Sequence, residues 1–232
     1  MADTYLLGID IGTSGCKTTL YDGNGEIRFH AAAGYPTHHP FPGAAEQDAE
    51  DWWQAVVSNC RKLRAECGGE IMRSIRAIGV AGQSGTFLPL DENGKPLRRA
   101  MIWLDRRSEP ECTRLRAGPL ADRLWRVSGN PVASSYITGK MLWYLEQEAP
   151  LARKTRLILQ SNSYIVYRLT GAPTQDVSQG NGLHFFDVAA KAWDAELIDA
   201  LGVPRPWLAP ICECGAIAGV VTEEAARATG LA

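Results

Sequence analysis

A carboxylate and a lysine flank a glycine-containing turn near the start of this 232-residue chain. Asp10 follows the apolar residues Leu6–Ile9, the turn Gly12-Thr13-Ser14-Gly15 comes next, and Lys17 lies just beyond it. Glycines let the backbone turn tightly and leave its N–H groups uncovered. Successive uncovered N–H groups form an anion-binding concavity. With Asp10 placed to hold a metal ion and Lys17 to meet negative charge, the stretch predicts a phosphate-handling hairpin.

Strands on both sides must position this turn. Alternating apolar residues predict a buried strand before it, and the threonine-rich residues 16–21 predict a second strand after it. A Walker loop is excluded because Cys16, not glycine, precedes Lys17. The dinucleotide fingerprint also fails, since the glycines stand at positions 8, 12 and 15 and a strand, not a helix, is expected next. Phosphate would therefore be held by a hairpin turn.

Composition narrows the class of protein. With 45% hydrophobic and 22% charged residues, the chain can build a substantial core as one large domain or two small ones. A net charge of −2 gives nucleic-acid binding no electrostatic support. The sequence contains no signal peptide and no apolar run of membrane-spanning length, so we expect a cytoplasmic protein that is not bound to a membrane. The six cysteines are expected to be reduced, and Cys212-x-Cys214 lacks the partners of a zinc site.

Local signals place further elements around the turn. Apolar spacings of three and four predict a helix that begins after the N-cap Asp48 and ends at Gly68-Gly69. Within it, we expect Trp53 to belong to the core and Trp52 to a neighbouring packing surface. The stretch "SIRAIGVAGQSG" predicts a buried strand that runs into a glycine-flanked loop. A hairpin with its turn at Asp91-Glu92-Asn93-Gly94 should follow.

Two more helices are predicted in the second half of the chain. The first covers residues 140–147 and stops at Pro150, and the second covers residues 163–169 and stops at Gly171. Antiparallel hairpins come first along the chain, and helices and strands then alternate. This order predicts a layered α/β domain.

Five stretches of the chain resemble one family, the FGGY carbohydrate kinases, and among these the xylulose kinase branch most closely. In chain order they are "GIDIGTSGCKTTLYD", "AEQDAEDWWQAV", "AIGVAGQSG", "AMIWLDRRS" and "YRLTGAPTQDVSQGNG". The first stretch alone is also found in actin- and hexokinase-type ATPases, but all five in this order are specific. The resemblance implies an α/β fold: a ribonuclease-H-like lobe of the actin/hexokinase type, with a mixed sheet and helices packed on it.

The resemblance also implies a phosphate side. ATP and Mg²⁺ would lie in a cleft between this lobe and a second, similar one. Asp10 would organise the magnesium ion, while Gly12, Thr13 and Ser14 would line the γ-phosphate. Lys17 stands where the family often has a basic residue, although a solvated strand lysine remains an alternative.

The implied sugar side comprises two loops, made by Gln83, Ser84 and Gly85 and by Trp103 and Asp105. Amide, hydroxyl and carboxylate groups can pair with sugar hydroxyls, and an indole face can cover the C–H side of a sugar. Xylulose kinases usually have Gln-Met-His-Gly where this chain has Gln83-Ser84-Gly85-Thr86. The Arg-Glu pair of glycerol kinases is absent too. We expect a pentulose such as D-xylulose, with ribulose, gluconate or glycerol as alternatives.

The family's catalytic base is an aspartate in a Gly-Gly-Asp segment, and residues 1–232 contain no match to it. We therefore expect the base to lie beyond Ala232. On this interpretation the chain is the N-terminal lobe, its main partner is its own C-terminal lobe, and it binds sugar weakly without turnover. A homodimer and a non-catalytic sugar- or nucleotide-binding module remain alternatives.

Two further groups of residues have alternative interpretations. Arg106 and Arg107 could reach phosphate or form a solvated basic edge. Asp176, Ser178 and Asn181 could lie near the sugar cleft or serve as turn residues.

Overall fold

Four strands form the main sheet in the computed structural model, which describes residues 4–231. The strands are β1 (Tyr5–Ile11), β2 (Gly15–Asp22), β3 (Ile27–Gly34) and β5 (Ile75–Gly82). They lie in the order β3-β2-β1-β5. The β1–β2 and β2–β3 pairs are antiparallel and the β1–β5 pair is parallel. The sheet is therefore mixed, as the sequence predicts.

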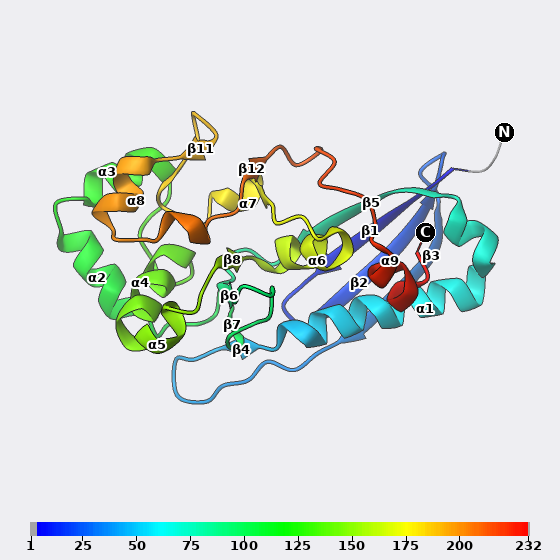
Figure 1. Cartoon of the computed structure of the whole chain (residues 1–232), viewed down its shortest axis with the longest axis horizontal. Helices are drawn as coiled ribbons and strands as arrows, with labels where there is room; N and C mark the ends of the chain where they lie inside the picture. The colour runs from blue at the N-terminus through cyan, green and yellow to red at the C-terminus, as the bar shows by residue number, and fades with distance from the viewer. Residues whose placement is uncertain (1–3, 232) are drawn as a thin grey trace.

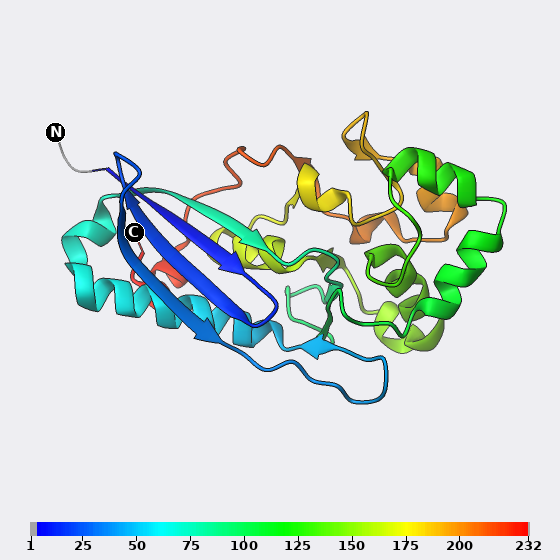
Figure 2. The ribbon, with the colours of Figure 1, turned by 180° about the vertical axis from the view of Figure 1, so that it is seen from behind.

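Alternation along β1 decides which way Asp10 faces. Leu7, Ile9 and Ile11 are buried, whereas Leu6 and Asp10 alternate with them and are partly or fully exposed. Because successive side chains of a strand point to opposite faces, the buried set anchors one face and Asp10 lies on the other. Figure 2 shows this second face without a helix in front of it.

Helices α1 (Ala49–Arg73) and α6 (Ser161–Thr170) cover the opposite face of the sheet (Figure 1). The predicted N-cap is confirmed, since the Asp48 side chain accepts a hydrogen bond from the Glu50 N–H. The predicted break at Gly68-Gly69 is confirmed, because Gly68 takes φ 84° and interrupts the helix there, but helical backbone then resumes to Arg73, which the sequence did not predict. Glycine adopts this conformation without steric cost, and the buried Met72 holds the resumed turn against the core.

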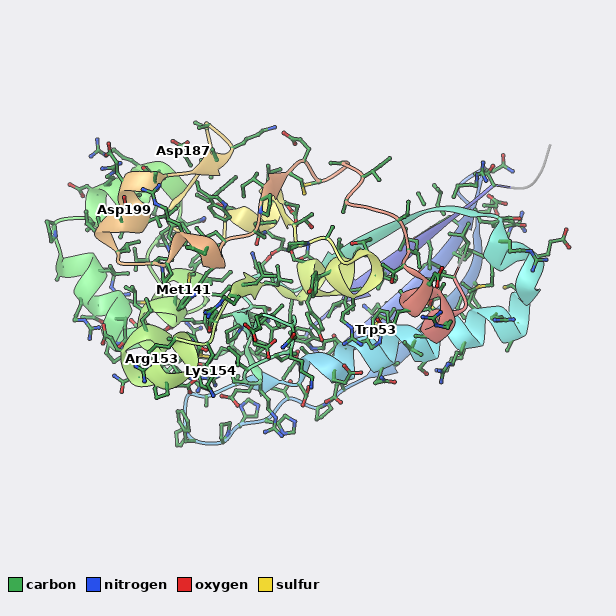
Figure 3. The ribbon with its side chains drawn as sticks, viewed as in Figure 1. Trp53, Met141, Arg153, Lys154, Asp187 and Asp199 are labelled. Carbon is green, nitrogen blue, oxygen red and sulfur yellow. The ribbon has the colours of Figure 1, made fainter. Side chains whose placement is uncertain are left out.

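Both tryptophans of α1 are buried, Trp52 completely and Trp53 almost so. The prediction that Trp53 belongs to the core is confirmed. The prediction that Trp52 belongs only to a neighbouring surface is wrong, because its indole is enclosed in the core and hydrogen-bonded there. Figure 3 shows Trp53 where α1 faces α6, and the Arg168 guanidinium lies 4.6 Å from the centre of the Trp53 ring.

The predicted strand "SIRAIGVAG" exists as β5, but it is not buried. Its residues alternate between half-buried and exposed. The physical reason is its place at the edge of the sheet, where only β1 pairs with it and helices cover only one face.

Short strands carry the chain from the sheet to the helical part. β4 (Glu46–Gln47) pairs with β7 (Ala100–Met101), and β6 (Leu88–Leu90) pairs with β8 (Leu157–Leu159). The predicted turn is present, since the Gly94 N–H donates to the Asp91 carbonyl at 3.1 Å. The predicted hairpin ladder is largely absent, because distant strands take the pairing positions of its two arms and leave single bridges such as Phe87–Met101.

The helical part has a second core, with Met141 of α4 among its residues (Figure 3). It includes α2 (Glu109–Ala117), α3 (Ala121–Ser128), α4 (Ile137–Gln147), α5 (Ala149–Ala152) and α8 (Ala195–Ala200). The prediction that Pro150 stops a helix is wrong: α4 ends at Gln147, and Pro150 sits in the first turn of α5, where a missing N–H is tolerated. The predicted stop at Gly171 is confirmed, with φ 73°.

The remaining elements are small. β9 (Gln175–Asp176) pairs with β12 (Ile211–Cys212), β10 (Phe186–Asp187) pairs with β11 (Ala192–Trp193), and α7 (Val177–Gly180) and a 3₁₀ turn (Arg205–Trp207) lie between them in sequence. The last helix, α9 (Glu223–Thr229), returns to α1 and α6. Within residues 4–231, no helix is both long and apolar enough to cross a bilayer.

Candidate functional site

The turn between β1 and β2 presents a carboxylate and free backbone donors on one face. Asp10 pairs with Lys17 across the two strands, but no ion pair joins their side chains among the described residues. The Gly12 N–H closes the turn on the Gly15 carbonyl at 3.1 Å. In the described part of the chain, the Thr13 and Ser14 N–H groups donate to no protein acceptor. Two donors and one carboxylate are thus available to a ligand.

Close backbone approach explains the glycines of this turn. A Cβ at Gly15 would lie 2.7 Å from the Ala33 carbonyl oxygen, and one at Gly12 would lie 3.2 Å from the Gly15 oxygen. The Tyr35 hydroxyl donates to the Gly12 carbonyl at 2.5 Å. Burial raises the pKa of Tyr35, so this hydroxyl stays protonated as a donor. The turn is therefore rigidly held before any ligand arrives.

The donor chemistry of the turn fits magnesium with phosphate. Mg²⁺ is commonly bound through one or two carboxylates together with substrate phosphate oxygens, rather than by a full protein cage. Residues 4–231 contain no cluster of three metal-ligating side chains. The Asp10 carboxylate, which makes no hydrogen bond or ion pair to the described residues, would hold the ion.

The loop after β5 lies beside this turn. Because β1 and β5 are parallel, their carboxyl ends meet at one edge of the sheet. The Gln83 N–H accordingly donates to the Ile11 carbonyl at 2.8 Å. The sheet thus brings the predicted sugar loop and the predicted phosphate turn together.

Gln83 is buried and tied into several elements. Its carbonyl accepts hydrogen bonds from the Ser161 hydroxyl at 3.0 Å and the Thr86 hydroxyl at 3.3 Å. Its side-chain Oε1 is buried with no hydrogen-bond partner among the described residues. Its neighbour Ser84 is exposed. The loop therefore offers an unmet acceptor and an accessible hydroxyl.

Gly85 must be glycine for two reasons. Its φ is +71°, and a Cβ there would lie 2.2 Å from the Ser135 carbonyl oxygen. The segment around Ser135 is held from behind by Lys140, whose Nζ donates to the Ser134 carbonyl at 2.7 Å and the Tyr136 carbonyl at 3.2 Å. The helical part of the molecule thus fixes one wall of this loop.

Trp103 joins the two predicted sides directly. Its indole Nε1 donates to the Thr13 hydroxyl at 3.0 Å. Trp103 is 39% exposed, which is high for tryptophan, so part of the residue is accessible to a ligand.

Asp105 is placed differently from the expectation that it meets the sugar. It is fully buried, and its carboxylate accepts from the Ala45 N–H at 2.7 Å and from Arg107 Nε at 2.9 and 3.0 Å. A further bond from Arg107 Nη2 measures 2.8 Å. The geometry makes Asp105 a support for the Trp103 loop, since its oxygens are already engaged.

Neither alternative for Arg107 matches the structure. Its guanidinium is buried between Asp105 and Glu46, with 2.6 Å to the latter, and lies 4.9 Å from the centre of the Phe41 ring. Arg106 is exposed and reaches the Ser134 hydroxyl at 3.4 Å. Arg107 is therefore a buried structural cation, and Arg106 remains open to either interpretation.

For Asp176, the structure matches the turn interpretation. Its carboxylate accepts from the N–H groups of Ser178 and Gln179, which caps α7. Burial raises the pKa of Asp176, but hydrogen bonds from Ser178 and Asn162 outweigh this and lower it overall. The same segment also supports the loop that follows β5 (the β5-end loop, residues 83–85), because Gln179 Nε2 donates to the Gly82 carbonyl at 3.1 Å.

Sequence reasoning missed three residues that organise this site: Tyr35, Gln47 and Lys140. Gln47 precedes the N-cap Asp48 within a stretch that resembles the family, which was the one available signal. Tyr35 and Lys140 gave no local signal, because their partners are separated from them in sequence or are backbone atoms.

The four-stranded mixed sheet, with helices on one face and a turn of free amides at its edge, defines a lobe of the actin/hexokinase-type ATPase fold. A profile described as "FGGY family of carbohydrate kinases, N-terminal domain" matches residues 5–232. The chain belongs to the FGGY family of carbohydrate kinases. The family resemblance and the fold predicted from the sequence are thereby confirmed.

Individual relatives agree with this assignment. The chain is 31% identical over 226 residues to a xylulose kinase of Escherichia coli strain K12, covering 97% of this chain and 46% of that protein. It is 33% identical to a glycerol kinase of Afipia carboxidovorans, covering 92% and 44%. A crystal structure of a xylulose kinase from Brucella ovis superimposes with a TM-score of 0.92 at 30% identity, covering 98% and 46%. The chain thus spans about half the length of these relatives.

Proposed function

We propose that this chain is the N-terminal lobe of an ATP-dependent kinase that phosphorylates a small sugar, with a pentulose such as D-xylulose as the best candidate. The observation that carries the proposal is the hydrogen bond from Trp103 to Thr13. It joins the loop that is proposed to bind sugar to the turn that is proposed to bind phosphate, at the carboxyl ends of β1 and β5. Relatives named xylulose kinase and glycerol kinase support a sugar or polyol substrate.

On the phosphate side, this chain supplies positioning and charge. Asp10 would hold Mg²⁺, which when bound neutralises charge on the phosphates. The free N–H groups of Thr13 and Ser14 would donate to phosphate oxygens, and Lys17 lies on the same face with an exposed side chain. Phosphoryl transfer depends mainly on such positioning and charge stabilisation, because the protein does little covalent chemistry.

On the sugar side, the open face of Trp103 would cover the C–H surface of the substrate, while Gln83 and Ser84 meet its hydroxyls. Gly85 lets the loop approach the 134–136 segment closely. Asp105 would not contact the substrate. It would hold the Trp103 loop in place through its contacts with Arg107 and the Ala45 N–H.

The general base is proposed to lie beyond Ala232, in the C-terminal half that the longer relatives contain. A base must be within hydrogen-bond reach of the hydroxyl that it deprotonates. Asp10 would be occupied with the metal ion, and Asp105 is buried with its oxygens engaged. This lobe is accordingly proposed to bind sugar weakly without turnover.

The test measures ADP release with pentuloses, pentoses and polyols, using this chain and the product of the full reading frame. We expect only the longer protein to turn over, and its Asp10→Asn variant to lose activity at least a hundredfold because the metal-holding carboxylate is gone. Turnover by the 232-residue chain would contradict the proposed location of the base. Absence of activity from both proteins would favour a sugar- or nucleotide-binding module.

A further inference from the structure

Gln47, in the short strand β4, is completely buried between the two candidate loops. A buried amide must have its hydrogen bonds satisfied, because water cannot reach it. Gln47 meets this condition entirely with groups from four separate segments of the chain.

The amide of Gln47 makes the four hydrogen bonds that its two donors and two lone pairs allow. Nε2 donates to the Thr13 carbonyl at 2.7 Å and to the Thr37 hydroxyl at 2.9 Å. Oε1 accepts from Trp52 Nε1 at 3.0 Å and from Gln83 Nε2 at 2.7 Å. The Gln47 side chain therefore connects the phosphate turn (residues 12–15) to the β5-end loop.

Two of these partners fix which way the Gln47 amide points. The Trp52 indole can only donate, and the Thr13 carbonyl can only accept. Oε1 of Gln47 must therefore face Trp52, and Nε2 must face Thr13. The reverse orientation would set donor against donor and acceptor against acceptor.

The orientation of the Gln47 amide also determines the orientation of the Gln83 amide. Since Gln47 turns Oε1 toward Gln83, only Nε2 of Gln83 can meet it. Oε1 of Gln83 is then left as the free end, and it is the atom that lies buried without a partner among the described residues. A buried acceptor without a hydrogen bond is unfavourable, and a hydroxyl group of a bound ligand would supply the missing hydrogen bond.

We propose that Gln47 is a positioning residue that orients Gln83 so that Gln83 Oε1 accepts a hydrogen bond from a substrate hydroxyl. The proposal rests on the proposed sugar-kinase function. The chain of orientation runs from Trp52 through Gln47 to Gln83, while the Gln47 bond to Thr13 ties the same chain to the phosphate turn. Gln47 itself contacts no substrate.

Two variants act on different parts of this chain of hydrogen bonds. Gln47→Met keeps the length of the side chain and removes all four hydrogen bonds, including the acceptor that orients Gln83. Trp52→Phe removes one of the two groups that fix the Gln47 amide and keeps an aromatic ring in the core, while the Thr13 carbonyl still faces Nε2 of Gln47. Trp53→Phe is the matched control, because the Trp53 indole makes no hydrogen bond to the described residues while its ring is also buried.

The measurement uses the ¹⁵N-labelled chain. Two-dimensional NMR follows the side-chain amides of Gln47 and Gln83, and calorimetry measures D-xylulose and glycerol binding. We expect Gln47→Met to move the Gln83 amide signals without ligand and to weaken binding of the better polyol about tenfold, equivalent to about 1.4 kcal/mol. Trp52→Phe should have a smaller effect on both, because the Thr13 carbonyl still fixes the Gln47 amide, and Trp53→Phe should leave the signals in place.

Three results would contradict the inference or its basis. If Gln47→Met leaves the Gln83 signals at their wild-type positions, the orientation chain is wrong, whatever binds. If a polyol binds without moving the Gln83 signals, the acceptor is filled by water and the substrate role is overturned. If neither polyol binds the wild-type chain, the proposed function fails for these two substrates, together with the substrate role of Gln83, while the ligand-free spectra still decide the orientation chain.

Discussion

The phosphate turn (residues 12–15) and the β5-end loop (residues 83–85) meet at one sheet edge but are built in opposite ways. The turn presents backbone N–H groups that two adjacent strands hold in place. The loop presents side chains that depend on Gln47, Ser161 and the helical part of the molecule. The proposed phosphate recognition would therefore rest on local backbone geometry, whereas the proposed recognition at the second loop would rest on contacts between distant segments.

The two candidate carboxylates show the same contrast. Asp10 is half-buried and its carboxylate makes no hydrogen bond or ion pair to the described residues, whereas Asp105 is fully buried with both carboxylate oxygens engaged. A carboxylate with unmet bonding capacity can take a ligand, and one with filled capacity holds the fold. Position in a family motif does not distinguish these two roles, because the distinction depends on the partners.

Breaking the buried carboxylate should have the largest effect on stability. Asp105→Asn removes the charge that neutralises the buried Arg107, and breaking such a pair costs about 3–5 kcal/mol. Urea unfolding of the variant and wild type checks this. A loss below about 1 kcal/mol would mean that Glu46 alone, 2.6 Å from Arg107, satisfies the cation.

Gly85→Ala should have the next largest effect, about 3 kcal/mol, because it adds a clash with the Ser135 carbonyl to the cost of a positive φ. The matched control is Gly25→Ala, where φ is +83° and nothing lies within 4 Å of the added Cβ. That control should lose only about 1 kcal/mol. Equal losses in urea unfolding would show that the 134–136 segment yields to the added methyl.

Lys140, which holds the segment next to Gly85, should make the free energy of unfolding depend on pH. Burial lowers the pKa of Lys140 to about 7, well below its value in an unfolded chain. The unfolded state then binds more protons above pH 7, so this residue makes stability rise with pH. Between pH 7 and 8, the free energy of unfolding of the wild type should rise relative to that of Lys140→Met, by at most about 1.4 kcal/mol per pH unit. Urea unfolding of both proteins at each pH measures this difference.

Comparing the two proteins at each pH isolates Lys140 from the buried thiols of Cys60 and Cys112. Burial raises the pKa of those thiols to about 12 and about 11, so they lower stability at higher pH in both proteins. Identical slopes for wild type and variant would show that Lys140 stays charged in the fold.

The smallest effect is expected at the open carboxylate. Asp10→Asn should change the free energy of unfolding by less than about 0.5 kcal/mol, because no protein partner among the described residues is lost. Urea unfolding beside Asp105→Asn gives the direct contrast. A loss comparable to that of Asp105→Asn would mean that Asp10 supports the fold, and its assignment as a metal holder would weaken.

Much of the sheet and its first helix could be predicted from the sequence, since their signals are local. Alternation in β1 and β2, the N-cap Asp48 and the stop at Gly171 all depend on neighbouring residues. The same holds for the phosphate turn, whose glycines and Asp10 stand within a few positions of one another. The sequence predicted the break at Gly68 but not the helical turn that follows it, and the prediction failed at Pro150, which lies at the start of a new helix.

The sequence by itself thus determined the family, the order of the main elements and the position of the turn. Only the tertiary structure decided that Asp105 is a buried support, that β5 is an open edge, and that Gln47 links the two loops. The reason is physical. Burial and hydrogen-bond saturation are set by which distant segments meet, and no pattern within a single segment records the partner that a side chain acquires.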